Sequence, residues 1–238
     1  MILPNVRASF GRAEVGAIMT AVAGAGSSAR ETLDQRLRDD GLDALLDDPR
    51  TLNAVLTGDH HGTPALVFYL LVRHALLESG LDDRTLADYI AAILVDFGRE
   101  DRAYRIAPDD PDTYHYLVDL VAAAETADGR RRFLVRAHLG NYALWLGGIF
   151  PDHVTYRVHR RGAPGLDYVE ALGAGGYRMA AESRLADEHG LSRLYHTAAE
   201  VFPELRVALN RISDRYLFPA RGGSVDRLLR QVSDAFGG

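Results

Sequence analysis

The chain has 238 residues, of which 47% are hydrophobic and 25% are charged, and its formal net charge is −6. This composition is typical of an ordinary soluble chain that can bury a full core. All 27 basic residues are arginine, and there is no cysteine. Schiff-base and PLP enzymes, phosphate-binding loops with a lysine, thiol nucleophiles and cysteine-ligated metal sites are therefore excluded.

Membrane insertion is not expected. The longest apolar runs, over residues 65–72 and 142–150, are far shorter than the ~18 residues that a membrane helix needs. Near the start of the chain, arginines precede an apolar stretch over residues 15–25, which resembles a signal peptide, but Glu14 and Thr20 weaken that interpretation. The expected location is therefore the cytoplasm.

Hydrophobic periodicity and end signals predict a succession of helices, and strand-like alternation is almost absent. Ser28 and Glu31 form a capping box, which predicts a helix that stops at Gly41. Asp82 is the predicted cap of a helix over residues 83–97.

A long apolar helix is predicted over residues 65–79. Thr63 supplies a cap, Pro64 occupies the first helical position, and Gly80 marks the stop. Seven more helices are predicted after residue 97. Their expected ranges are 110–128, 130–150, 151–161, 166–189 with a break at 173–176, 191–202, 203–217 and 225–236.

The expected fold class is therefore all-α, a single compact multi-helix domain of about ten helices that spans residues 1–238. Its two central apolar helices are those over 65–79 and 130–150. The only long irregular stretch predicted runs over residues 99–109. Two helical halves with a boundary near 99–110 are the alternative to one domain.

Charged residues in the apolar helix 65–79 need a separate interpretation. Arg73, His74 and Glu78 fall within an arc of about 140° on a helical wheel, which predicts a solvated stripe. On the predicted helix 110–128, the wheel gathers Asp112, His115, Tyr116 and Asp119 on one side. Both helices would then be ordinary amphipathic helices.

Metal-ligand patterns do not form a set. His74 and Glu78 are four residues apart, but the second Glu-x-x-His motif that a dinuclear site needs is absent. The aspartate-rich stretch over residues 39–43 is interrupted by the helix stop at Gly41, so its carboxylates would not share one face. No metal site is expected, and no cofactor is indicated.

A glycine-rich segment, Gly173-Ala174-Gly175-Gly176, follows a helix instead of a strand. A dinucleotide-binding loop needs the opposite order, which excludes that class. The segment is interpreted as a hinge or as the site of a close helix crossing.

Positive charge is concentrated in residues 129–161. Seven arginines stand there against the single acid Asp152, a local formal charge of +6, so the rest of the chain carries −12. Arg131, His138, Tyr142 and Trp145 fall within about 60° of one another on the helical wheel, with Asn141 beside them. This stripe predicts a pocket wall. The expected ligand-binding residues are Arg136, His138, Asn141, Tyr142, Trp145, Arg157, Arg160 and Arg161.

Three classes of function follow, in this order. The first is a non-catalytic helical protein that binds an acidic protein or a small anionic ligand, because arginine grips carboxylates and phosphates with its planar fork. The second is an enzyme with His138 as general acid or base and Arg136 or Arg157 as anion stabiliser. Nucleic-acid binding comes last, since the pI of about 5.8 opposes it. A solvated cluster of helix-end arginines is the alternative that needs no ligand.

Overall fold

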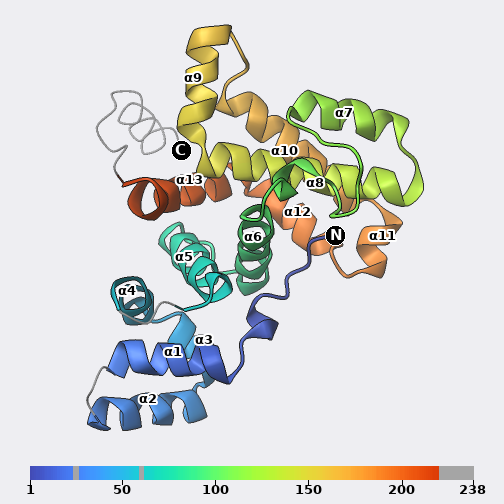
Figure 1. The fold of residues 1–238 in the computed structure, drawn as a ribbon. Coiled ribbons are helices and arrows are strands. Elements are labelled where there is room, and N and C mark those ends of the chain that lie inside the picture. Colours follow the sequence, from blue (N-terminus) through green and yellow to red (C-terminus); the bar gives the residue numbers. More distant parts are fainter. Residues whose placement is uncertain (24–26, 59–61, 220–238) are drawn as a thin grey trace. The chain divides into compact units, whose positions relative to one another are not determined.

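The computed structural model describes residues 1–23, 27–58 and 62–219 (Figure 1). Over these ranges it contains thirteen α-helices and no strand, so the all-α prediction is confirmed. No helix in this part of the chain combines the length and the apolar character that crossing a bilayer requires. The predicted helix over 225–236 lies outside the described residues.

Contacts divide the chain into two units, and the expectation of a single domain stays a prediction. The first unit is Ile2–Asp96, and the second takes in the described residues from Phe97 onward together with Met1. The helices that make up the first unit are α1 (Arg12–Ala23), α2 (Ser27–Asp39), α3 (Gly41–Leu46), α4 (Pro49–Thr57), α5 (Pro64–Glu78) and α6 (Arg84–Phe97) up to Asp96.

Local end signals account for the boundaries of α5. The Thr63 hydroxyl accepts a hydrogen bond from the Leu66 amide (3.3 Å), Pro64 is the first helical residue, and Gly80 adopts a left-handed φ of 77° beyond the helix end. The prediction for this helix is confirmed. Each of these signals acts within a few residues, so the sequence alone reveals it.

Two predicted caps in this unit are wrong. Ser28 already lies inside α2, which begins one residue earlier, so Ser28 is not a cap. The cap of α6 is Asp83, whose carboxylate accepts from the Leu86 amide (2.9 Å), and not Asp82. The carboxylate of Asp82 instead forms an ion pair with Arg73 on α5.

Burial of Arg73 contradicts the predicted solvated stripe. This side chain is only 1% exposed, and its guanidinium donates to both carboxylate oxygens of Asp47 (2.7 and 2.9 Å) and to Asp82 (2.5 Å). His74 is also buried, with Nε2 3.0 Å from the carbonyl oxygen of Leu46. Carboxylates from neighbouring segments make this burial tolerable, and a helical wheel cannot show them.

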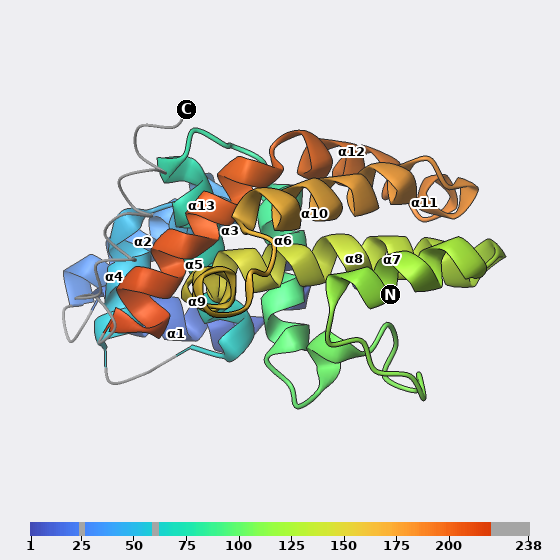
Figure 2. The ribbon, with the colours of Figure 1, turned by 90° about the horizontal axis from the view of Figure 1, so that it is seen from above.

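The second unit is organised around α8, against which α7, α10 and α13 pack (Figure 2). Its helices are α7 (Leu117–Thr126), α8 (Gly129–Ile149), α9 (Pro151–Arg161), α10 (Leu166–Ala181), α11 (Arg184–Glu188), α12 (Ser192–Glu200) and α13 (Phe202–Ile212), followed by a π turn over Ser213–Leu217. The boundaries predicted for α8 and α9 differ from these by at most one residue.

The glycine-rich segment 173–176 lies inside α10, which continues through it, so the predicted break is wrong. Its small residues instead allow neighbouring helices to pack closely against α10. A Cβ added to Gly173 would lie 2.2 Å from the Phe202 ring, and one added to Gly176 would lie 2.9 Å from the backbone nitrogen of Gly140 on α8. Any larger side chain would force these helices apart.

The C-terminus of α8 receives its hydrogen bonds from α13 and the π turn after it. The side-chain amide of Asn210 donates to the carbonyl oxygens of Gly147 (2.8 Å) and Gly148 (2.7 Å). The Ser213 hydroxyl donates to that of Ile149 (2.7 Å). These carbonyls have no partner within the helix, so the side chains of a distant segment complete its end.

The helix predicted to begin at Asp110 begins only at Leu117. The buried Asp110 carboxylate accepts from the Asp112 amide (3.1 Å), and the Tyr114 amide donates to the carbonyl oxygen of Tyr104 (2.7 Å). These bonds occupy backbone groups that a helix would have paired internally. The seven residues before Leu117 therefore form a loop, and this loop reaches the candidate site.

Candidate functional site

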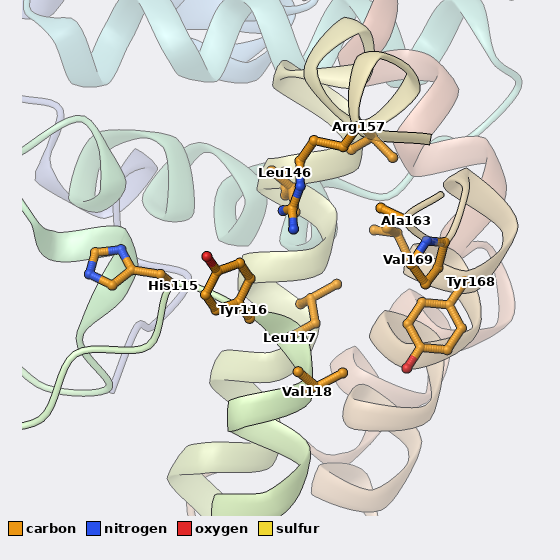
Figure 3. A pocket seen from close by; sticks show the side chains of 11 residues that line it. His115, Tyr116, Leu117, Val118, Leu146, Arg157, Ala163, Tyr168 and Val169 are labelled. Atoms are coloured by element: carbon orange, nitrogen blue, oxygen red, sulfur yellow. The ribbon is translucent and has the colours of Figure 1, made fainter. Parts of the chain in front are cut away.

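Two adjoining cavities lie in the second unit, with volumes of about 490 Å³ and about 180 Å³. The lining of the larger cavity is mostly aromatic and consists of Tyr104, His115, Tyr116, Tyr142, Trp145, Leu146, Phe150, His153, Tyr156 and Arg157. The lining of the smaller one is His115, Tyr116, Leu117, Val118, Leu146, Val154, Arg157, Ala163, Pro164, Tyr168 and Val169 (Figure 3). His115, Tyr116, Leu146 and Arg157 belong to both linings, so the cavities meet there.

The helix α9 supplies the arginine of this site because the chain turns sharply between α8 and α9. Phe150 leaves helical geometry (φ −122°, ψ 47°), and Pro151 then starts α9, which stands across α8 in both ribbon views (Figures 1 and 2). In the close-up, the Arg157 side chain extends from α9 toward the ring of Tyr116 (Figure 3). The turn thus places Arg157 over Tyr116 of the loop before α7.

One wall of the larger cavity is an aromatic stripe on α8. The rings of Tyr142 and Trp145 are stacked with centroids 5.9 Å apart, and Phe150 meets Trp145 edge-on at 4.8 Å. Tyr104 contributes from the 3-10 turn Arg102–Tyr104, with its ring centroid 4.5 Å from that of His115. Flat rings in such walls suit a planar ligand, which can stack or pack edge-to-face on them.

A hydrogen bond from Tyr142 connects the loop to this wall. The Tyr142 hydroxyl donates to the backbone carbonyl oxygen of His115 (3.0 Å). Burial raises the pKa of Tyr142 well above its ordinary value, so the hydroxyl keeps its proton and remains a donor. The positions of His115 and of its neighbour Tyr116 in the cavity therefore depend on α8.

Arg157 is the permanent positive charge of the site. Its guanidinium carbon lies 5.3 Å from the centroid of the Tyr116 ring, a cation–π arrangement. Its Nε is buried without a hydrogen-bond partner. Neither lining contains a carboxylate, and Arg157 forms no ion pair with any residue described by the structure. An anion in the cavity would therefore meet a cation whose charge is not already neutralised.

Exposed apolar side chains gather around the two cavities. The large apolar residues exposed in the described chain are Met1, Leu3, Tyr116, Val118, Tyr156, Tyr168 and Tyr216. Four of them line the cavities, namely Tyr116, Val118, Tyr156 and Tyr168. Exposed apolar groups gathered at one place on a surface often mark a site of interaction.

His138 lies outside both linings. It is 3% exposed, and its ring is parallel to that of Tyr142 with centroids 6.2 Å apart. Burial, and then the charge of Arg102, lowers the pKa of His138 to about 3 against a backbone hydrogen bond with Ala103 that raises it. The imidazole is therefore neutral, and it packs beside the Tyr142 ring of the aromatic wall.

The structure separates the other predicted site residues. Tyr142, Trp145 and Arg157 line the larger cavity. Arg136 and Asn141 face α10 instead, where Arg136 donates to the Met179 carbonyl oxygen (3.4 Å) and Asn141 accepts from the Tyr177 hydroxyl (2.9 Å). Arg160 lies over the Tyr156 ring at 5.7 Å, and the side chain of Arg161 lies outside the described part of the chain.

The positive charge of residues 129–161 does not form one patch. Arg130, Arg131 and Arg132 lie at the start of α8, whereas α9 follows its end, and a helix of 21 residues is about 30 Å long. Part of the first group is also engaged, because Arg131 pairs with Asp110 (3.4 Å) and Asp112 (3.2 Å). Arg157 and Arg160 are the cations near the cavities.

Sequence reasoning misses the residues that precede α7 in the site. Tyr104 lies in the predicted irregular stretch 99–109, whereas His115 and Tyr116 fall in the predicted helix 110–128. One signal was available, because the apolar periodicity of this region begins only at Leu117 and aromatic residues crowd the stretch before it. His153 and Tyr156 of α9 also line the larger cavity.

Comparison with known proteins finds no matching family model, no matching curated protein and no matching solved structure. In the ranges 1–23, 27–58 and 62–219, no three histidine or acidic side chains come together as a metal site. The chemistry that the cavities themselves present is an aromatic wall, two histidines and one arginine without a counter-ion.

Proposed function

We propose that this protein binds a small planar anion, an aromatic compound that carries a carboxylate or a similarly compact charged group. The observation that carries the proposal is Arg157, a cation without a counter-ion beside an aromatic wall. A carboxylate beside this guanidinium would gain a charge-assisted hydrogen bond, which is stronger than a bond between neutral groups. The rings of Tyr142 and Trp145 would receive the planar part.

The size of the larger cavity supports a small ligand. About 490 Å³ lies within the range of roughly 300–1,000 Å³ that is usual for small-molecule sites. A polyanion such as a nucleic acid needs several cations along its backbone, whereas the arginines at the start of α8 are separated from this site by the length of that helix. A catalytic role for His138 lacks support, because His138 lines neither cavity.

Trp145 provides a direct test, since it is the only tryptophan of the chain and lies in the wall of the site. The probe is anilinonaphthalene sulfonate, an aromatic anion whose emission can be excited by energy transfer from tryptophan. Its neutral counterpart is phenylnaphthylamine, which lacks the sulfonate. We expect the anion to bind about tenfold more tightly than the neutral compound, the effect of one charge-assisted hydrogen bond.

Two variants distinguish binding at this site from nonspecific binding of the probes. Arg157→Gln should weaken binding of the anionic probe about tenfold and leave the neutral probe unchanged. Arg130→Gln, at the exposed start of α8 and outside both linings, is the matched control and should change neither affinity. Equal affinities of the two probes for the wild type, or an unchanged anion affinity in Arg157→Gln, would overturn the proposal.

A further inference from the structure

The smaller cavity differs in chemistry from the larger one. Apart from the residues that it shares with the larger cavity and from Tyr168, its lining is aliphatic and consists of Leu117, Val118, Val154, Ala163, Pro164 and Val169. Its polar groups, except for the Tyr168 hydroxyl, therefore lie where the two cavities meet, at His115, Tyr116 and Arg157. The site thus has an aromatic part, a cationic junction and an aliphatic part.

We infer that the ligand is an aromatic acid with a short alkyl chain, in which the carboxylate lies between the ring and the chain. This inference rests on the proposed function. The ring would occupy the larger cavity, the carboxylate would meet Arg157 at the junction, and the alkyl chain would enter the smaller cavity. In the close-up, Arg157 reaches between Tyr116 on one side and Val169 on the other, as such a branched ligand requires (Figure 3).

The volume of the smaller cavity sets the length of the chain. About 180 Å³ equals the space of about six water molecules in the liquid, which suits an alkyl group of about four to six carbons. Each methylene that leaves water for such a cavity strengthens binding about threefold to fourfold. A chain of four carbons that is largely buried should therefore raise affinity by well over tenfold.

The beginning of α7 adds to the charge preference at this junction. Leu117 and Val118 line the smaller cavity, and no side chain caps the helix that they start. The helix dipole gives that end a partial positive charge, which the exposed Asp119 in the first turn offsets in part. Arg157 is therefore the main source of positive charge where the cavities meet, and the helix end adds to it.

The test compares two acids by titration calorimetry. One is naphthylacetate, and the other is the same acid with a butyl chain on its α-carbon. We expect the butyl compound to bind the wild type at least tenfold more tightly. Ala163→Phe, in the loop after α9, should fill the smaller cavity and abolish this advantage while the affinity for naphthylacetate stays the same.

The matched control is Ala122→Phe, which adds the same ring on the exposed face of α7 outside both linings and should keep the advantage. Circular dichroism checks that Ala163→Phe is folded, and Ala163→Leu replaces it if it is not. The inference is overturned if both acids bind the wild type equally, or if the filled variant keeps the tenfold advantage. In this experiment the proposed function fails in a different way, namely if naphthylacetate does not bind the wild type or binds Arg157→Gln equally well.

Discussion

The hydroxyl group of Tyr142 on α8 is hydrogen-bonded to the backbone carbonyl oxygen of His115, 27 residues earlier in the chain. This bond joins the central helix of the second unit to the loop that carries His115 and Tyr116. Both cavities include these two residues, so the shape of the site depends on this contact.

Tyr142→Phe removes the bond and keeps the ring. We expect faster amide hydrogen exchange in residues 112–116 and binding of anilinonaphthalene sulfonate weakened by about threefold to tenfold, since a hydrogen bond of this kind contributes about 1 kcal/mol. Tyr156→Phe is the control, because it also loses a hydroxyl in the larger cavity but is 57% exposed. Equal exchange rates in the two variants would show that the bond does not hold the loop.

Two glycines of α10 offer a matched pair for stability. A Cβ at Gly173 would lie 2.2 Å from the Phe202 ring and 2.8 Å from the Ala143 side chain, whereas one at Gly175 would meet nothing within 4 Å. Gly173→Ala should therefore reduce the free energy of unfolding by about 1–3 kcal/mol. Gly175→Ala should leave it unchanged or raise it by up to ~1 kcal/mol, since alanine favours a helix. Urea denaturation measures both, and a loss of stability in both variants would contradict the close crossing.

The buried ion pair of the first unit predicts a large loss in Arg73→Met. Asp47 would keep only Arg84 (2.6 Å) as its partner, and its carboxylate is 20% exposed. Burial alone would raise the pKa of Asp47, and hydrogen bonds from Arg73 and Arg84 outweigh this effect and lower it. Removal of Arg73 should cost about 2–4 kcal/mol of unfolding free energy.

The comparison for Arg73→Met is Arg184→Met, which breaks an exposed pair with Glu188 on α11. Exposed pairs contribute little, so this change should stay within about 0.5 kcal/mol. Thermal and urea denaturation followed by circular dichroism give both values. If the two variants lost equal stability, the burial of Arg73 would have no energetic consequence.

His138 makes stability depend on pH. Its pKa in the folded protein is about 3, below the ordinary value of 6.5, so between these values the unfolded chain binds the extra proton. Acidification through this window should therefore reduce the free energy of unfolding by up to ~1.4 kcal/mol per pH unit. In His138→Phe the loss per unit should be smaller by about that amount, whereas above pH ~6.5 the two slopes should coincide. Identical slopes below pH ~6 would argue against this role of His138.

Helix positions could be predicted wherever their end signals are local. Thr63, Pro64 and Gly80 define α5 within a few residues of its ends, and Pro151 with Gly162 does the same for α9. The prediction omits α4, although Asp48, Pro49 and Gly58 mark its ends in the same way. It also omits α1 and the short helix α3, so the predicted number of about ten helices is lower than the thirteen in the described residues.

The site could be predicted only where it lies on one helix. The spacing of His138, Tyr142 and Trp145 predicts a common face, and their rings do follow one another along α8. The burial of Arg73 and the path of the loop before α7 depend on residues that are far away in the sequence. Asp47 lies 26 residues from Arg73, and no local pattern encodes such a partner.

The end of α8 connects the site to the order in which the chain is made. Its last carbonyl oxygens are paired by Asn210 and Ser213, which follow them by 62 to 64 positions. The ribosome must therefore synthesise α9 to α12 and most of α13 before the hydrogen bonds at the end of α8 can form. A nascent chain that stops short of Asn210 leaves these carbonyl oxygens without their partners, so we expect binding of the proposed ligand only after Ser213 has been added.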